Sequence, residues 1–147
     1  MPHLSALGLD LGHRRIGVAG CDGTGLIATG LMTLQRTSFT SDMAILRQIV
    51  DERQVQILVV GLPYTMKGEL GSQARRTQKL ARRIAQALNL PLHYVDERLT
   101  SCEAEGLIRT QGLNLAKHRD LIDRKAAALI LQQWLDQKLW QSSMGSE

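Results

Sequence analysis

The pattern of apolar and polar positions predicts that the chain opens with a β-hairpin. Residues 6–11 form an apolar run that contains one acid, residues 12–15 are polar, and residues 16–21 are apolar again. Two apolar runs joined by a short polar turn are typical of paired antiparallel strands. A second turn, rich in glycine, follows at 22–25 and predicts a third antiparallel strand over Leu26–Leu34.

Four helices and two more strands are predicted beyond that point. A helix capped by Thr40 or Ser41 comes first, because apolar residues recur after these positions at helical spacing. The wholly apolar run 56–60 is typical of a strand that is buried on both faces. The remaining elements are a helix over 72–88, a strand over 92–95, a helix opened by a capping box at Thr100 and Glu103, and a helix from about Asp120 to Leu139.

This order of elements predicts an α/β fold. A hairpin followed by strand–helix–strand crossovers gives a mixed sheet with helices packed on its faces. Right-handed crossovers place the fourth and fifth strands beyond the first. We therefore expect a five-stranded mixed sheet, with three antiparallel strands and then two parallel ones, flanked by helices. One domain is expected over residues 1–140, with a disordered tail at 141–147.

The composition of the chain fits one compact domain with an anionic partner. Its 147 residues are enough for one hydrophobic core, and 44% apolar with 22% charged residues is ordinary for a globular protein. The 18 Lys and Arg residues outnumber the 14 Asp and Glu residues, which suits a nucleic acid. Aromatic residues make up only 3%, which argues against a platform for stacking single-stranded bases.

The cysteines and the N-terminus predict a cytoplasmic protein. Cys21 and Cys102 are far apart and belong to no Cys/His cluster, so we expect reduced thiols instead of a disulfide or a zinc site. The first residues lack the features of a secretion signal, and no apolar stretch is long enough to cross a bilayer. We therefore expect no contact with a membrane.

Two acids are predicted at one edge of the sheet. Asp10 interrupts the apolar first strand, where an uncompensated carboxylate would cost several kcal/mol. It would be either a metal ligand or an acceptor of backbone hydrogen bonds at the hairpin turn. Glu97 directly follows the fifth strand, whose end should meet the same edge. By itself, Glu97 is better explained as a surface residue paired with Arg98.

A third acid, Asp123, begins an inward-facing stripe on the last helix. Helical spacing places it on one face with Ala127, Ile130 and Trp134, which are typical core residues. Its alternative role is to complement the helix dipole, worth about 0.3–1 kcal/mol, but the outward position of Asp120 would serve that role equally well. Converging carboxylates need a cation, and oxygen ligands select Mg²⁺ or Mn²⁺. Such ions support phosphodiester hydrolysis.

Short motifs occur in a fixed order from Leu7 to Leu135. Each is weak alone, but the ordered set is specific: the chain resembles the YqgF/RuvX family of resolvase-like nucleases with an RNase H-like fold. The motifs are Asp10-Leu11-Gly12 with Gly17-Val18-Ala19, Val60-Gly61-Leu62-Pro63 with Gly68, Asp96-Glu97-Arg98-Leu99-Thr100, and Asp123 followed by Ala126-Ala127 and Ile130-Leu131.

The resemblance implies that Asp10, Glu97 and Asp123 form the acidic triad of the family. It also implies processing of the 5′ end of precursor 16S ribosomal RNA, with cleavage of Holliday junctions in branched DNA as the alternative. Junction resolvases use four carboxylates, and only Asp96 and Asp120 are candidates for a fourth ligand in this sequence.

Basic residues are predicted to hold the nucleic-acid backbone without reading its sequence. One helix carries five of them on one face, and a phosphate track and an ordinary solvated face explain that stripe about equally well. Other basic residues lie on loops or element ends nearer the acids. The predicted contacts are Arg75, Arg76, Lys79, Arg82 and Arg83 on the helix, and Arg14, Arg15, Lys67, Arg98 and Arg119 elsewhere, with Lys117 and Arg124 close by.

Two other classes of function remain open at this point. Sugar kinases and related ATPases begin with a similar acid-bearing hairpin, but they need a second domain that this length does not provide. A non-catalytic nucleic-acid-binding module would need only the basic helix, yet it would gain nothing from buried acids that face phosphates. Both a monomer and a homodimer are compatible with the sequence.

Overall fold

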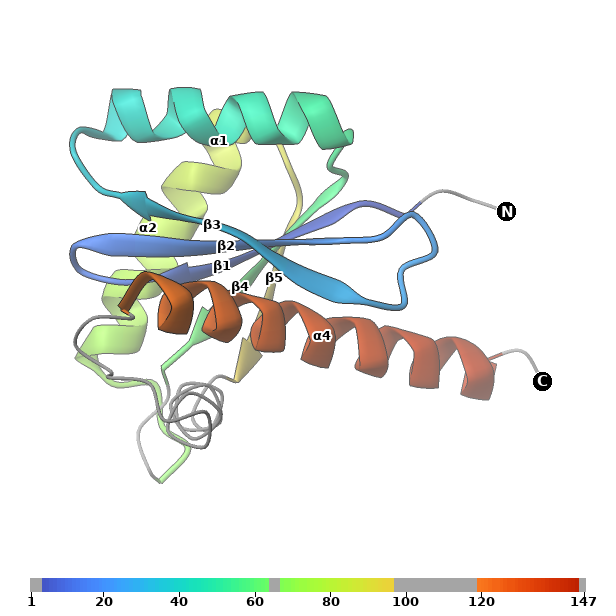
Figure 1. Cartoon of the computed structure of the whole chain (residues 1–147). Coiled ribbons are helices and arrows are strands. Elements are labelled where there is room, and N and C mark those ends of the chain that lie inside the picture. Colours follow the sequence, from blue (N-terminus) through green and yellow to red (C-terminus); the bar gives the residue numbers. More distant parts are fainter. Residues whose placement is uncertain (1–3, 64–66, 97–118, 146–147) are drawn as a thin grey trace, which may run out of the picture.

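A computed structural model describes residues 4–63, 67–96 and 119–145 of the chain (Figure 1). Within these ranges no helix has both the length and the apolar character that a membrane span needs. The predicted helix after Thr100 lies outside the described residues, as does the capping box proposed to start it.

The sheet has the strand order that the sequence predicts. Strands β1 and β2 pair antiparallel, β2 pairs antiparallel with β3, and both β4 and β5 run parallel to β1. The order across the sheet is β3-β2-β1-β4-β5, so β1 is central. The strands are β1 (Ala6–Leu11), β2 (Arg15–Cys21), β3 (Ala28–Gln35), β4 (Ile57–Leu62) and β5 (Leu92–Asp96).

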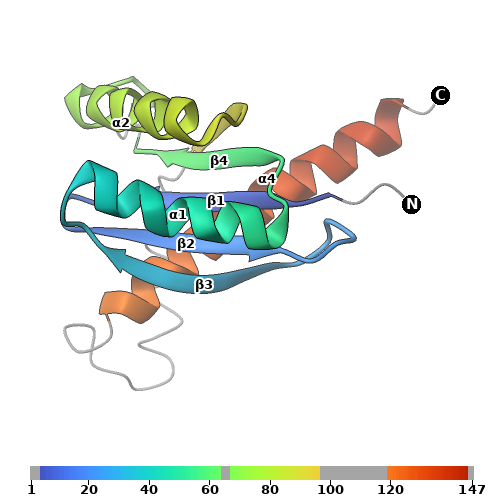
Figure 2. The ribbon, with the colours of Figure 1, turned by 90° about the horizontal axis from the view of Figure 1, so that it is seen from above.

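Helices cover both faces of this sheet. Helices α1 (Phe39–Arg53) and α2 (Ser72–Leu88) lie on one face, and α4 (Arg119–Gly145) crosses the other diagonally (Figures 1 and 2). We call these the α1/α2 face and the α4 face. The bounds of α2 match the predicted helix, whereas α4 continues past the expected end at Leu139.

Strand alternation divides the core between the two faces. Successive side chains of a strand point to opposite faces, so each strand contributes every second residue to each core. The α1/α2 face buries large aliphatic residues, and the α4 face buries smaller ones. The strand residues of the two cores are Leu7, Leu9, Ile16, Val18, Leu34, Leu58 and Val60 on the α1/α2 face, and Ala6, Ala19, Cys21, Val59 and Val95 on the α4 face.

Glycines allow α4 to lie close to the sheet. A Cβ added to Gly8 would come within 2.7 Å of the Leu131 Cβ. A Cβ on Gly30 would approach the Arg124 Cβ to 3.0 Å, and one on Gly17 would overlap the carbonyl oxygen of Asp123. The missing side chains therefore fix where α4 sits on β1, β2 and β3.

Polar side chains explain two of the differences between predicted and observed boundaries. Helix α1 is capped by Ser38, whose hydroxyl accepts a hydrogen bond from the Ser41 N–H at 3.1 Å, and not by Thr40 or Ser41. Strand β3 begins at Ala28, later than predicted, because the backbone N–H groups of Leu26 and Ile27 donate to the Asp22 carboxylate. The sequence alone does not show which of several neighbouring hydroxyl or carboxylate side chains caps a helix or a turn.

Candidate active site

Asp10 lies near the carboxyl end of the central strand and on the α4 face. Its neighbours Leu9 and Leu11 pack into the core of the α1/α2 face, so alternation turns the Asp10 side chain the other way. Gly8, which shares the face of Asp10, lies under α4. The Asp10 side chain is half-buried. A carboxylate in this position faces the first turns of α4 at the edge of the sheet.

Gly17 brings Asp123 to Asp10. It is the partner of Asp10 in the β1–β2 register, and directly opposed residues of antiparallel strands have Cα atoms about 4.5–5.5 Å apart. The backbone of α4 passes over Gly17 at Asp123, closely enough that any Cβ on Gly17 would overlap the Asp123 carbonyl oxygen. Asp10 and Asp123 are therefore neighbours, brought together by strand pairing on one side and by helix packing on the other.

Asp123 stands at the start of the buried stripe that the sequence predicts. Further along α4, Ala127 and Ile130 have no exposed surface and Trp134 is 7% exposed. Asp123 retains 20% of its side-chain surface, so it marks the point where this stripe reaches solvent. A first-turn acid that served only the helix dipole would not need this inward position.

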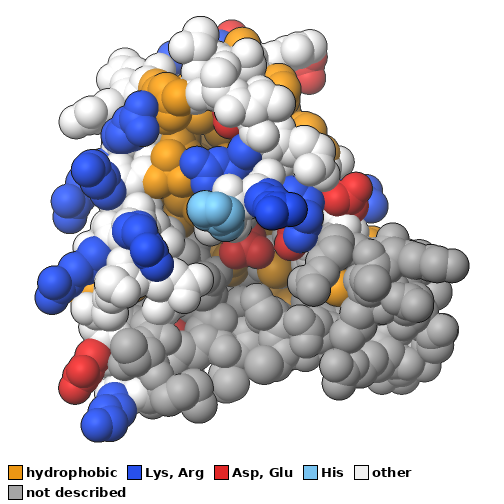
Figure 3. All heavy atoms as spheres, turned by 90° about the vertical axis from the view of Figure 1, so that its left-hand side faces the viewer, with side chains coloured by type: hydrophobic (Ala, Val, Ile, Leu, Met, Phe, Trp, Pro, Cys, Tyr) orange, Lys and Arg blue, Asp and Glu red, His pale blue; other side chains and the backbone are white. Residues whose placement is uncertain are grey.

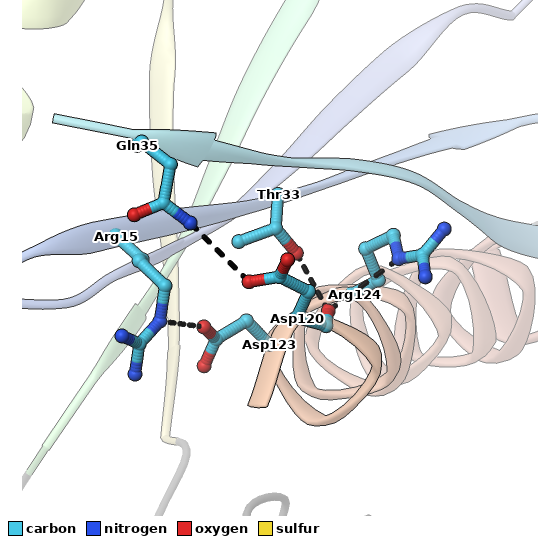
Figure 4. A network of polar contacts seen from close by, with 6 residues as sticks. All are labelled: Arg15, Thr33, Gln35, Asp120, Asp123 and Arg124. Atoms are coloured by element: carbon cyan, nitrogen blue, oxygen red, sulfur yellow. Dashed lines mark hydrogen bonds and ion pairs between the residues drawn. The ribbon is translucent and has the colours of Figure 1, made fainter. Parts of the chain in front are cut away.

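Arg15 pairs directly with Asp123. Its Nε donates to Asp123 Oδ2 at 2.7 Å, and its terminal nitrogens point away from that carboxylate (Figure 4). Arg15 shares the α4 face with Gly17, two residues later on β2. The sequence predicts Arg15 as a nucleic-acid contact but gives no sign of this ion pair. Counting alternate residues back from Gly17 would have placed Arg15 beside the helix.

The two candidates for a fourth ligand, Asp96 and Asp120, have different surroundings. Asp96 follows Val95, which packs on the α4 face, so alternation directs Asp96 to the opposite face. The Asp120 carboxylate accepts a hydrogen bond from Gln35 Nε2 at 3.3 Å, and the Asp120 carbonyl accepts one from the Thr33 hydroxyl at 2.6 Å (Figure 4). Both partners are on β3, two strands from Asp10.

Two acids of the predicted triad are thus brought together, and the third lies outside the described residues. Among the residues that the structure describes, no three His, Cys, Asp or Glu side chains form a potential metal cluster. Glu97 directly follows β5, beyond the described range. Asp10 and Asp123 contribute carboxylate oxygens only, which is the donor chemistry that suits Mg²⁺ or Mn²⁺ and not zinc.

The basic stripe predicted on α2 is present. Its five Lys and Arg residues are exposed, whereas Ala81, Ile84 and Leu88 are buried on the opposite side. Arg82 lies beside Tyr94; burial raises the pKa of the Tyr94 phenol and the Arg82 charge opposes that rise. Arg14 and Lys67 are also exposed. Arg98 and Lys117 lie outside the described residues, and only the backbone of Arg119 is described.

Comparison with known proteins identifies the family. The profile of the RuvX family, described as a Holliday junction resolvase, matches residues 4–137. The chain belongs to the RuvX family. A relative from Acaryochloris marina, named "Putative pre-16S rRNA nuclease", is 73% identical over 143 residues, covering 97% of this chain and 99% of the relative. A relative of the same name from Synechococcus elongatus is 56% identical over 146 residues, covering 99% and 98%.

Solved structures show the fold of this RuvX-family chain. RuvC from Thermus thermophilus, in a structure titled as a complex with Holliday junction substrate, superposes with a TM-score of 0.57 at 15% identity, covering 94% of this chain and 97% of RuvC. A second RuvC structure from Thermus thermophilus gives a TM-score of 0.53 at 14% identity, covering 93% and 97%. The predicted RNase H-like fold is therefore confirmed. The family and its named relatives are nucleases, so this RuvX-family protein is a nuclease.

Proposed function

We propose that this RuvX-family nuclease hydrolyses phosphodiester bonds at Asp10 and Asp123, with Glu97 as the third acid, and that it trims the 5′ end of precursor 16S ribosomal RNA. The observation that carries the proposal is that Gly17, the strand partner of Asp10, is also the residue over which the backbone of Asp123 packs. The names of relatives up to 73% identical support the RNA substrate. The family description supports branched DNA as the second candidate.

Asp10, Asp123 and Glu97 would hold Mg²⁺ or Mn²⁺. When bound, such ions lower the pKa of a water and stabilise the charge on the leaving oxygen. The protein contributes the fixed position of its carboxylates, because Asp10 belongs to a central strand and Asp123 to a helix seated on glycine. Side chains on rigid elements hold a productive geometry better than side chains on loops.

Arg15 has two tasks in this proposal. Its Nε orients Asp123, and its terminal nitrogens, directed away from that carboxylate, are available for a phosphate oxygen (Figure 4). A guanidinium can make both contacts together because its five donors lie in one plane. Without substrate, the Arg15 charge offsets part of the negative charge of Asp123 and competes with a metal ion for Oδ2.

The variant Arg15→Gln is expected to move metal binding and cleavage in opposite directions. Mn²⁺ should bind the substrate-free protein several-fold more tightly, because a competing cation is gone. Cleavage should slow by about 10- to 100-fold, the range expected when a charged hydrogen bond to phosphate is lost. The free energy of unfolding should change by less than about 1 kcal/mol, because the Arg15–Asp123 pair is partly exposed. Calorimetric Mn²⁺ titration, single-turnover cleavage and denaturant unfolding measure the three quantities.

Arg124→Gln is the matched control for Arg15. The Arg124 Nε donates to the carbonyl of Asp120 at 3.4 Å. Like Arg15→Gln, this variant removes one positive charge, but it does not remove a hydrogen bond to Asp123. It should leave the Mn²⁺ affinity unchanged within about twofold. Weaker Mn²⁺ binding by Arg15→Gln would contradict the proposed competition between Arg15 and the metal ion. Unchanged cleavage would contradict the proposed contact between Arg15 and a phosphate.

The proposed substrate is tested by direct competition between RNA and branched DNA. The wild-type protein is incubated with a precursor 16S 5′-end fragment, a four-way DNA junction and an unbranched duplex, each with Mg²⁺, Mn²⁺ or EDTA. We expect cleavage of the RNA fragment with either metal and none in EDTA. Preferential cleavage of the junction would replace the RNA assignment with the resolvase one, and metal-independent cleavage would contradict the proposed mechanism.

A further inference from the structure

A cavity of about 630 Å³ lies on the opposite face of the sheet from Asp10, at the same end of β1. The β1–β2 turn forms one wall, α2 forms another, and Arg36, which follows β3, closes a third side. Leu11 lines the cavity, although it follows Asp10 directly in the chain, because alternation sends the two side chains to different faces. The turn at Gly12 and His13 therefore separates the cavity from the acids.

The polar lining of the cavity is cationic. Four Lys and Arg side chains and one imidazole face it, and none of the described residues that line it is a carboxylate. In Figure 3, Lys and Arg side chains gather around a histidine at this end of the molecule, with carboxylates directly below. The four cations are Arg36, Arg76, Lys79 and Arg83.

Two of these cations are fixed by groups that leave their charge uncompensated. The Arg36 Nη1 donates to the carbonyl oxygens of Gly12 and His13 at 2.9 and 3.1 Å. The Arg83 guanidinium lies over the Phe39 ring, 4.1 Å from its centroid. Carbonyls and an aromatic ring orient a guanidinium but do not neutralise it. Cations that are oriented in this way but not neutralised can bind an anion.

The remaining lining indicates an anion with an organic body. Leu11 and Leu80 supply apolar surface, and the Thr77 side chain, only 8% exposed, adds a polar group between them. A volume of about 630 Å³ is within the range of small-molecule sites and much larger than one phosphate ion needs. A phosphate joined to a sugar and a base fits both the charge and the size.

We propose that this cavity binds one nucleotide of the nucleic-acid strand, with its phosphate on Arg36, Lys79 and Arg83, away from the bond that is cut. This inference rests on the proposed nuclease function and extends it, because a strand leaving Asp10 must pass over the β1–β2 turn to reach the cavity. The exposed His13 and Arg14 lie on that path. The bound nucleotide is either an internal unit of the strand or a free 5′-phosphorylated end.

The test compares two pairs of charge-removing substitutions on α2. The variant Lys79→Gln/Arg83→Gln removes two cations that line the cavity, and Arg75→Gln/Arg82→Gln removes two exposed cations that do not. Binding of a labelled single-stranded RNA is measured by fluorescence anisotropy in EDTA, so that binding is read without metal. We expect a loss of about 10-fold or more for the cavity pair, as for loss of charged hydrogen bonds, and about threefold or less for the control pair.

Salt and end chemistry separate the possible outcomes. The slope of log affinity against log salt should fall by about 0.7 or more for the cavity pair relative to the control pair, which corresponds to one lost phosphate contact. If 5′-UMP competes with the RNA and a 5′-hydroxyl RNA binds more weakly, the cavity holds a free end. If 5′-UMP does not compete and the 5′-hydroxyl RNA binds equally well, but the cavity pair still binds RNA selectively more weakly, the cavity binds an internal nucleotide. Equal losses for the two pairs would overturn the cavity site.

Cleavage by the wild-type protein distinguishes failure of the cavity from failure of the proposed function. Wild-type protein that cuts RNA while the two variant pairs bind equally disproves only the cavity. A selective binding loss in the cavity pair, together with no cleavage of any substrate by the wild type, supports the cavity and removes the nuclease assignment of Asp10 and Asp123.

Discussion

Replacing Asp10 by asparagine is expected to lower the rate of phosphodiester cleavage by about 1,000-fold, because the loss of a metal-binding charge costs several kcal/mol of transition-state stabilisation. Asparagine keeps the shape of the side chain in its half-buried position on β1. It removes one of two neighbouring negative charges, so the free energy of unfolding should stay within about 1 kcal/mol of the wild-type value in EDTA. Single-turnover cleavage with Mg²⁺ or Mn²⁺ and denaturant unfolding in EDTA test both statements.

Asp120→Asn is the matched control for Asp10→Asn. Asp120 is an acid in the first turn of α4, and its carboxylate accepts a hydrogen bond from Gln35 on β3. The same loss of charge there should change cleavage by less than about fivefold. A large loss of cleavage in Asp120→Asn, together with retained cleavage in Asp10→Asn, would mean that the catalytic centre lies on the other side of the helix.

The fold was predictable because its determinants are local and repeated. Apolar runs bounded by turn residues identified every described strand, and chain order with crossover handedness predicted the observed position of β1 between β2 and β4. The helix over Ser72–Leu88 was predicted with its observed bounds, since its apolar and basic faces separate sharply. Polar side chains that cap a helix or a turn, as Ser38 and Asp22 do, shifted two boundaries, and α4 continues past its predicted end at Leu139.

The sequence singles out the acids of the candidate site but not their contacts. Asp10 and Asp123 could be found because a carboxylate in an apolar pattern requires a reason. The ion pair of Arg15 with Asp123 joins residues 108 positions apart, and the position of Arg36 on two turn carbonyls depends on how β3 ends. No local pattern contains such contacts, because tertiary packing alone creates them.

Gly17 links the fold to the site, because the backbone of Asp123 packs directly against it. The variant Gly17→Ala is expected to slow cleavage by about 100-fold or more, since displacement of a reacting group by about 1 Å can have that effect. The new methyl would overlap the carbonyl oxygen of Asp123 and force the first turns of α4 away from β2. Overpacking should also cost about 1–3 kcal/mol of stability. Single-turnover cleavage and thermal unfolding measure the two effects.

Gly8→Ala separates stability from positioning in this experiment. Its methyl would meet the Leu131 Cβ at 2.7 Å, and residue 131 lies about 12 Å along α4 from Asp123 at 1.5 Å per residue. Both variants overpack the same helix, so we expect similar losses of stability. Cleavage should fall much further in Gly17→Ala, because its methyl meets the backbone of Asp123 itself, whereas the methyl of Gly8→Ala meets α4 at Ala127 and Leu131. Equal cleavage by the two variants would mean that the separation of Asp10 and Asp123 does not govern the reaction, and Asp123 would then lose its place in the site.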